Sequence, residues 1–240
     1  MGIYQPRHAM VQTEDSPERR FLVRGGLAAA AGAVVGGAGL IVPATASATT
    51  TARPTLKRGS RGSSVKSLQR TLRANGYWHS GSDGVFGQTT EQAVMAVQKV
   101  RGLGRDGVCG PQTWAAVDSL SRPRARTTSG NIMELDLTRQ VVIFVVSGRV
   151  KWVFNTSTGK SGWRTPRGRF TFFRQVNGSD SGPYGSLWRP KYFNGGIAIH
   201  GSPSIPGYPA SHGCARLSNA ATNYIWANSL APMGRKVWVY

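Results

Sequence analysis

A short turn-and-helix motif occurs twice in the first half of the chain and restricts what residues 56–118 can form. The string DGVFGxxT begins at Asp83 and returns 23 residues further on as DGVCGxxT, beginning at Asp106. Aspartate followed by glycine marks a tight turn. Each copy leads into apolar residues spaced three or four apart, the period of a helix. Two such copies predict a small helical bundle with a glycine-punctuated turn before each later helix.

Helical periodicity indicates three helices in this bundle. The first is expected over Ser64–Asn75, the second begins near Thr89, and the third opens with Pro111, a residue suited to the first helical position. The aspartates of the two turns are expected to shape the backbone there rather than to touch a ligand.

The string LKxGxxGxxV from Leu56, together with the two turns, resembles the three-helix peptidoglycan-binding module found beside many cell-wall enzymes. The resemblance covers nearly all of residues 56–118 and implies binding to the glycan strands of peptidoglycan. Tyr77, Trp78 and His79 either line a glycan groove or serve as packing and surface residues. The alternative for the whole module is a helical spacer without a ligand.

The first 48 residues have the features of an export signal. A pair of arginines, Arg19 and Arg20, precedes apolar residues, and no charged residue occurs from Gly25 to Ala52. The paired arginines resemble a twin-arginine signal, and the small-residue pattern ending at Ala48 predicts cleavage there. An uncleaved membrane anchor is the alternative. We therefore expect an exported protein of the cell wall or extracellular space, without stable membrane insertion after cleavage.

The charge of the chain agrees with that location. Thirty lysines and arginines face ten acidic residues, giving a formal net charge of +20. A charge of this sign favours polyanionic partners. Outside the cell these are anionic wall polymers and the carboxylates of peptidoglycan stems, and nucleic acid is not expected as a partner.

Residues 119–130 are predicted to be a linker, because they are rich in Ser, Thr, Pro, Gly and Arg. From residue 131 to residue 240 the apolar period changes to two, which predicts a mostly-β domain. A buried strand is expected over Gln140–Val146, and Ser147-Gly148 suits a hairpin turn. One helix is expected to begin after Ser218 or Asn219.

The two cysteines of the chain have different surroundings. Cys109 lies in one of the repeated turns at a position that an apolar residue would fill, whereas Cys214 has His212, Gly213 and Arg216 beside it. Positive neighbours favour the thiolate, the nucleophilic form of cysteine. A disulfide between the two cysteines is the alternative for an exported protein.

Acyl transfer by a thiol needs a base and donors for the oxyanion. The residues next to Cys214 along a strand point away from it, so His200, at the end of its own short strand, is the expected base. Gly213 removes side-chain bulk, so that backbone N–H groups nearby can face a substrate carbonyl. Arg216 is expected to hold a substrate carboxylate or to brace the loop.

Five strings in residues 131–240 resemble the L,D-transpeptidase catalytic domain of the YkuD type. They are STGK from Ser157, TPxGxF from Thr165, IHG from Ile199, SHGCARL from Ser211 and VWV from Val237. The interval from His200 to Ser211, with ten intervening residues, is toward the short end for the family. The resemblance implies a two-part chain, a three-helix module followed by a mostly-β sandwich domain with one notable helix.

The resemblance also implies roles for the site. Cys214 is the nucleophile and His200 its base, His212 and Gly213 help to build the oxyanion site, and the Gly201 carbonyl orients the base. Ser211 and Arg216 belong to the same loop. Weaker candidates for a substrate-binding lid are Tyr184, Trp188 and Tyr192.

The implied reaction is cross-linking of peptidoglycan stem tetrapeptides. Cys214 attacks the bond between the third residue and D-alanine, D-alanine leaves, and the amine of another stem resolves the thioester to a 3→3 link. Acylation of the cysteine by carbapenems is implied as well. No cofactor is expected.

Three other functions stay open. With water as the acceptor the same site is an L,D-carboxypeptidase. A non-catalytic wall-binding protein would leave Cys214 beside two histidines without a purpose. A zinc site at His200, His212 and Cys214 has the right ligand types, but no HExxH string or fourth ligand stands out, and no metal is predicted.

Overall fold

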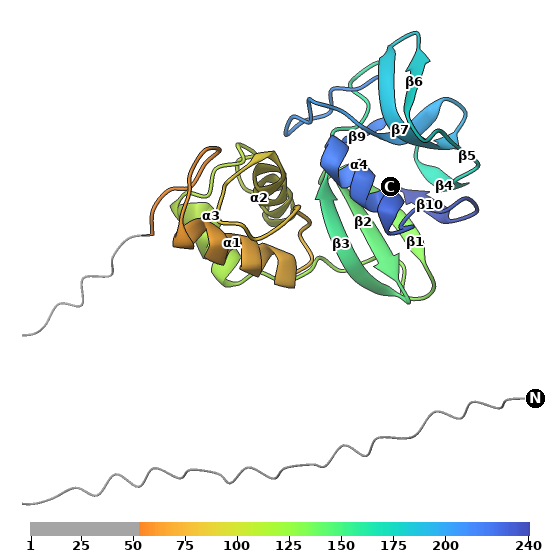
Figure 1. Ribbon diagram of the computed structural model, residues 1–240. Helices are drawn as coiled ribbons and strands as arrows, with labels where there is room; N and C mark the ends of the chain where they lie inside the picture. The colour runs from red at the N-terminus through yellow and green to blue at the C-terminus, as the bar shows by residue number, and fades with distance from the viewer. Residues whose placement is uncertain (1–52) are drawn as a thin grey trace, which may run out of the picture. The chain divides into compact units, whose positions relative to one another are not determined.

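The computed structural model describes residues 53–240, so the predicted export signal at 1–48 lies outside the described residues. The first part of the described chain contains the three expected helices, which Figure 1 shows in orange to green. They are α1 (Ser63–Ala74), α2 (Gln88–Arg101) and α3 (Pro111–Asp118). None of the helices in residues 53–240 is both long and apolar enough to span a membrane.

Each repeated turn is held by a buried glutamine from the preceding helix. In the first copy, Gln69 Nε2 donates to Asp83 Oδ1 at 2.9 Å and to Thr90 Oγ1 at 3.0 Å, while its Oε1 accepts from Gly84 N at 2.9 Å. Gly84 has a φ of 81°, a backbone conformation that favours glycine. The aspartate therefore shapes the turn, as predicted.

The second copy repeats these contacts around Gln98. Its Nε2 donates to Asp106 Oδ1 at 2.6 Å and to Thr113 Oγ1 at 3.2 Å, and its Oε1 accepts from Gly107 N at 2.9 Å. The internal repeat is thus a repeat of one hydrogen-bonded cluster, and the glutamine is its central residue.

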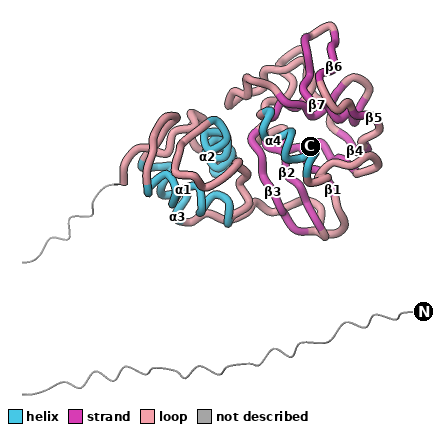
Figure 2. The backbone as a smooth tube through the Cα atoms, in the orientation of Figure 1, coloured by secondary structure: helices cyan, strands magenta, loops and turns pink. Residues whose placement is uncertain are grey.

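The second part of the described chain contains two five-stranded groups of strands (Figure 2). The first sheet has the order β3-β2-β1-β10-β4, with bounds Arg149–Asn155, Val141–Val146, Ile132–Asp136, Lys236–Val239 and Gly168–Thr171. The second has the order β5-β7-β8-β9, with bounds Arg174–Gln175, Gly185–Asn194, Ile197–Gly201 and Ala215–Leu217, and β6 (Ser179–Gly182) pairs with β7. Only β1 with β10 and β8 with β9 pair in parallel among these strands.

One apolar core joins both sheets to the helix α4 (Asn219–Ala227). It includes Phe144 of the first sheet, Ile199 of the second and Ile225 of α4, all fully buried. The helix begins where predicted, because Ser218 Oγ accepts from Ala221 N at 3.1 Å as an N-cap. The expected mostly-β sandwich with one helix is confirmed.

The strand β2 is buried on both faces, which explains its unbroken apolar run. Successive side chains of a strand point to opposite faces. Val142 and Phe144 belong to the sandwich core, whereas Val141, Ile143 and Val145 belong to a second core that also contains residues of α1, α2 and α3. The helical module therefore covers the outer face of the first sheet.

Tyr77, Trp78 and His79 pack inside the protein and form no glycan groove. All three are at least 96% buried. Tyr77 makes a β-bridge to Val153, and the ring of Trp78 lies 5.3 Å from that of Phe154 in a stacked arrangement. His79 is held by the carbonyl oxygens of the residues around it, at 2.7 and 3.0 Å.

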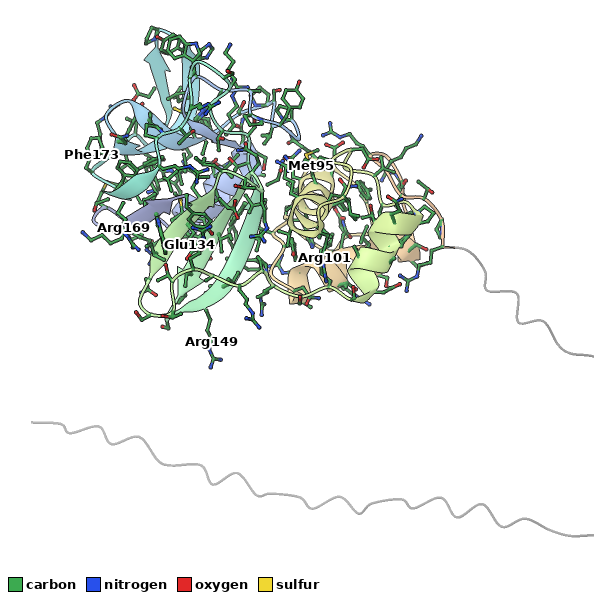
Figure 3. All side chains as sticks on the ribbon, turned by 180° about the vertical axis from the view of Figure 1, so that it is seen from behind. Met95, Arg101, Glu134, Arg149, Arg169 and Phe173 are labelled. Carbon is green, nitrogen blue, oxygen red and sulfur yellow. The ribbon has the colours of Figure 1, made fainter. Side chains whose placement is uncertain are left out.

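The segment 119–130 contains no helix or strand, but it is hydrogen bonded to its surroundings. Arg122 Nη2 donates to Ala74 O at 3.1 Å, and the backbone N–H of Thr127 donates to Glu134 Oε1 at 2.7 Å. Glu134, labelled in Figure 3, is fully buried and also accepts from Tyr240 Oη at 2.9 Å. The predicted linker is therefore an ordered basic loop.

Candidate active site

The second sheet places the predicted thiol and base on one face. In the parallel pair of β8 and β9, His200 lies beside Arg216, so that Ala198, two residues earlier, lies beside Cys214. The backbone N–H of Ala198 contacts Cys214 Sγ at 3.4 Å. Because residues two apart on a strand share a face, the side chains of His200 and Cys214 point to the same side of the sheet.

Both side chains line a cavity of about 630 Å³. Five more of the predicted residues line it, namely Ser211, His212, Arg216, Tyr184 and Tyr192. Gly201 and Gly213 are not among the lining residues. Trp188 is a packing residue, because its Nε1 donates to Asn223 Oδ1 of α4 at 2.9 Å and it does not line the cavity.

The carbonyl of Gly201 sets the orientation of the His200 ring. Nδ1 lies 2.9 Å from Gly201 O, which makes Nδ1 the protonated nitrogen and leaves Nε2 with a lone pair. A side chain at 201 would be crowded, because a Cβ there would lie 2.6 Å from Asn219 Oδ1 and 3.1 Å from Trp188 Cβ. Burial lowers the pKa of His200 to about 4. The imidazole is therefore neutral at neutral pH.

The thiol of Cys214 is also neutral in this state, which corrects the expectation of a resting thiolate. Burial raises the pKa of the Cys214 thiol, and the Ala198 N–H and the Arg216 guanidinium only partly oppose that rise. The thiol lies 3.7 Å from Gly196 O, an acceptor that suits a protonated sulfur. The pair is a neutral thiol beside a neutral imidazole.

The loop before Cys214 is braced by two hydroxyl groups. Ser211 Oγ donates to Cys214 O at 2.5 Å and accepts from Gly213 N at 3.1 Å. Thr165 Oγ1 donates to Gly213 O at 2.6 Å. The Gly213 N–H is thus already bonded to Ser211 Oγ in this state, and the part of His212 and Gly213 in the oxyanion site stays a prediction.

Gly213 has a structural reason to be glycine. Its φ is 118°, a conformation that side chains disfavour. The strings STGK and TPxG have a related role, since Lys160 N donates to Ser211 O at 2.9 Å and Gly159 N donates to Thr165 Oγ1 at 3.0 Å. These motifs build the support of the cysteine loop.

His212 packs against two aromatic rings, which also contact each other at 5.0 Å. The ring of Tyr184 stacks on it at 4.8 Å, and the ring of Trp163 meets it edge-on at 5.0 Å. Trp163 and Tyr184 are 42% and 60% exposed. Trp163 was not predicted, and its sequence signal is a large aromatic residue inside the motif-bearing loop.

Two charged lining residues, Arg174 of β5 and Asp180 of β6, were not among the predicted site residues. Cys109 is fully buried in the core shared with the helical module, and both cysteines of the described chain are free. Within residues 53–240, no group of three His, Cys, Asp or Glu side chains is arranged to hold a metal ion.

Comparison with known proteins divides the chain into the same two parts as the structure, the helical module and the mostly-β domain. Residues 61–117 match the family model of a peptidoglycan binding domain, and residues 130–239 match that of the L,D-transpeptidase catalytic domain (YkuD). A solved L,D-transpeptidase structure (residues 123–326) from Xylanimonas cellulosilytica is 46% identical with a TM-score of 0.76, over 79% of this chain and 98% of that one.

Two curated amidases resemble a smaller part of this chain. The N-acetylmuramoyl-L-alanine amidase CwlL of Bacillus licheniformis is 40% identical over 76 residues, 31% of this chain and 21% of its own. A probable N-acetylmuramoyl-L-alanine amidase of the same species is 42% identical over 66 residues, 27% of this chain and 19% of its own. The chain thus spans about a fifth of the length of these relatives.

Proposed function

The chain belongs to the L,D-transpeptidase family, and we propose that it cross-links peptidoglycan stem peptides through a thioester on Cys214. The observation that carries the proposal is the register of β8 and β9. It puts the Cys214 thiol and the His200 imidazole on one face of a single cavity, with the free Nε2 as the base.

The first half of the reaction is acylation. His200 Nε2 takes the thiol proton while Cys214 Sγ attacks the carbonyl carbon of the third stem residue. The carbon–sulfur bond forms, the carbon–nitrogen bond to D-alanine breaks, and the proton passes from Nε2 to the leaving amine. The N–H groups of His212 and Cys214 stabilise the oxyanion in this step.

The neutral state of the pair suits this order of events. A thiol of raised pKa and an imidazole of lowered pKa leave both members of the pair uncharged until the substrate is bound. The proton then moves in the same step as the attack, and Arg216 lies beside His200 in the register, where its charge stabilises the developing thiolate.

The second half is resolution of the thioester. The amine of a second stem attacks the acyl carbon, His200 removes its proton, and the thiol is regenerated as a 3→3 link forms. Water in place of the amine gives a tripeptide, the L,D-carboxypeptidase reaction. We propose the amine as the physiological acceptor, and the helical module as the part that keeps the enzyme on peptidoglycan outside the cell.

The test is mass spectrometry of purified disaccharide tetrapeptide incubated with the protein. A cross-linked dimer with loss of one D-alanine supports transpeptidation, and tripeptide alone supports the carboxypeptidase. Cys214→Ala is expected to abolish both products. Cys109→Ala is the matched control, since the other cysteine lies in the core shared with the helical module and its removal leaves the cavity unchanged. Products that persist in Cys214→Ala would overturn the proposal.

A further inference from the structure

The segment 202–210, called the connecting loop below, joins the strand of the base to the turn that carries the nucleophile. It begins directly after β8 and leads into Ser211, whose hydroxyl donates to Cys214 O. Two of its residues, Ser202 and Ser204, line the cavity that contains the thiol. The position of the connecting loop therefore affects both the cavity wall and the support of the nucleophile.

The connecting loop has little structure of its own. It contains no helix or strand, and it includes the prolines Pro203, Pro206 and Pro209. A proline has no backbone N–H to donate. The hydrogen bonds that form inside this part of the described chain join only Ser202 and Ser204. The shape of the loop must therefore be set by groups outside it.

Side chains from other elements hold the middle of the connecting loop by its carbonyl groups. The three contacts are Asn155 Nδ2 to Ile205 O at 3.5 Å, Arg105 Nη1 to Gly207 O at 3.1 Å, and Ser157 Oγ to Tyr208 O at 2.7 Å. Each of these side chains donates, and each loop carbonyl accepts. The loop thus depends on three donors that are distant from it in the sequence.

Two of these three contacts depend on the helical module. Arg105 lies in the module itself, between α2 and α3. Asn155 lies at the end of β3, and its Nδ2 also donates to Gln92 Oε1 of α2 at 2.5 Å. The module therefore bonds the connecting loop directly at Gly207 and supports it through Asn155 at Ile205.

The contact between Arg105 and Gly207 is a close fit. A Cβ at position 207 would lie 2.8 Å from the Cβ and 2.8 Å from the carbonyl oxygen of Arg105. The φ of Gly207 lies outside the left-handed region, so the backbone there does not require glycine. Arg105 is also anchored by Nη2, which donates to Thr138 O at 3.4 Å. The absence of a side chain at 207 is therefore explained by the approach of Arg105.

We propose that Arg105 is a positioning residue for the reaction at Cys214. Its guanidinium holds the connecting loop at Gly207, and the loop in turn keeps Ser211 beneath the nucleophile. The helical module then contributes to acyl transfer as well as to attachment to peptidoglycan. Small displacements of reacting groups cost much of the rate. This inference rests on the proposed function.

Loss of the Arg105 contact is expected to affect catalysis more than folding. The side chain is exposed, and the donors Asn155 and Ser157 still hold the loop on either side of Gly207. Gly207 O can then bond to water. The fold therefore remains, while the connecting loop gains freedom and the nucleophile spends less time in the reactive position.

The experiment measures D-alanine release from a stem tetrapeptide without its sugars, so that no glycan contact of the module contributes. We expect Arg105→Gln to lower kcat by at least about fivefold and to leave KM within about twofold. Arg101→Gln is the matched control. Arg101, labelled in Figure 3, also donates to a backbone carbonyl, that of Ser119 at the end of α3, and does not contact the connecting loop. This control is expected to keep kcat within about twofold.

A second substitution tests the contact from the other side. In Gly207→Ala the added methyl group displaces Arg105, so kcat is expected to fall as in Arg105→Gln. The double variant is expected to lose no more than about twofold beyond either single variant, because both changes break one contact. Urea denaturation shows whether each variant is folded under the assay conditions.

The outcomes distinguish this inference from the function on which it rests. An unchanged kcat in Arg105→Gln overturns the inference and leaves the transpeptidase proposal intact. Equal losses in Arg105→Gln and Arg101→Gln overturn it too, because they would indicate a general weakening of the module. Additive losses in the double variant would show that the two residues act separately, which also contradicts it.

The inference stays testable if Gly207→Ala fails to fold, because the comparison of Arg105→Gln with Arg101→Gln then decides it. Absence of D-alanine release by the unmodified protein overturns the proposed function, and the inference with it.

Discussion

The buried ammonium of Lys99 donates to the carbonyl oxygen of Thr156 at 2.7 Å, and joins the helical module to the strand end beside the active site. It also donates to Gln140 O at 3.1 Å, and Thr156 Oγ1 donates to Arg216 O at 2.8 Å. Arg216 lies beside His200 in the sheet. Two hydrogen bonds in series, through Thr156, therefore lead from α2 to the strand that follows the nucleophile.

Substitution of Lys99 by Met is expected to destabilise the protein by about 1–3 kcal/mol. It leaves two buried carbonyl groups without donors while keeping the aliphatic chain, and an unsatisfied buried acceptor is costly. Urea denaturation followed by fluorescence measures the free energy of unfolding. Lys66→Met, on the exposed side of α1, is the control and should change stability by less than about 0.5 kcal/mol.

The same lysine predicts a dependence of stability on pH. Burial lowers the pKa of Lys99 to about 7 from its ordinary value of 10.5. Between these two values the unfolded state binds the proton more strongly than the folded state, so this residue makes stability rise with pH from about 7 to 10.5. The difference in the free energy of unfolding between the unmodified protein and Lys99→Met should therefore grow over that pH range. A difference independent of pH would show that Lys99 titrates normally.

The acid limb of catalysis is expected near pH 4. Burial lowers the pKa of His200 to about 4, and the imidazole acts as a base only when neutral, so kcat/KM should fall as the pH decreases through that value. The measurement is the pH profile of D-alanine release under conditions where the fold is intact. An acid limb near 6.5, the ordinary pKa of histidine, would contradict the buried environment of this side chain.

Ser211→Ala is expected to lower kcat by about 10- to 100-fold with a smaller effect on KM. The substitution removes the donor to Cys214 O and the acceptor of Gly213 N, so the loop that carries the nucleophile loses both contacts of this hydroxyl. Thr165→Val, which frees Gly213 O, should act in the same direction. Ser129→Ala, at an exposed position of the basic loop, is the control and should behave as the unmodified protein.

Gln98→Ala is expected to destabilise the helical module by about 2–3 kcal/mol. It leaves Gly107 N without its acceptor and the Asp106 turn without its central donor. Gln112→Ala removes an exposed glutamine from α3 and should cost less than about 0.5 kcal/mol. Equal effects of the two substitutions on the melting temperature would argue against the cluster as the reason for the repeat.

Local patterns were sufficient for most of the secondary structure. The three helices begin within one residue of their predicted starts, and the strand expected over Gln140–Val146 is β2, Val141–Val146. The hairpin at Ser147 and Gly148 has the positive φ values, 49° and 73°, that a tight turn requires. These features depend on residues that are close together in the sequence, so the sequence alone is enough to predict them.

The sequence by itself determined the two parts of the chain, the repeat, and a thiol and an imidazole on separate segments. Only the tertiary structure decided the ionisation of that pair, because burial depends on residues that are distant in the sequence. It also decided that Gly213 N is already bonded to Ser211 Oγ, that Arg174 and Asp180 line the cavity, and that Trp163 packs against His212. Each of these depends on strands that pair across long intervals of the chain, and no local pattern records which residues such pairing brings together.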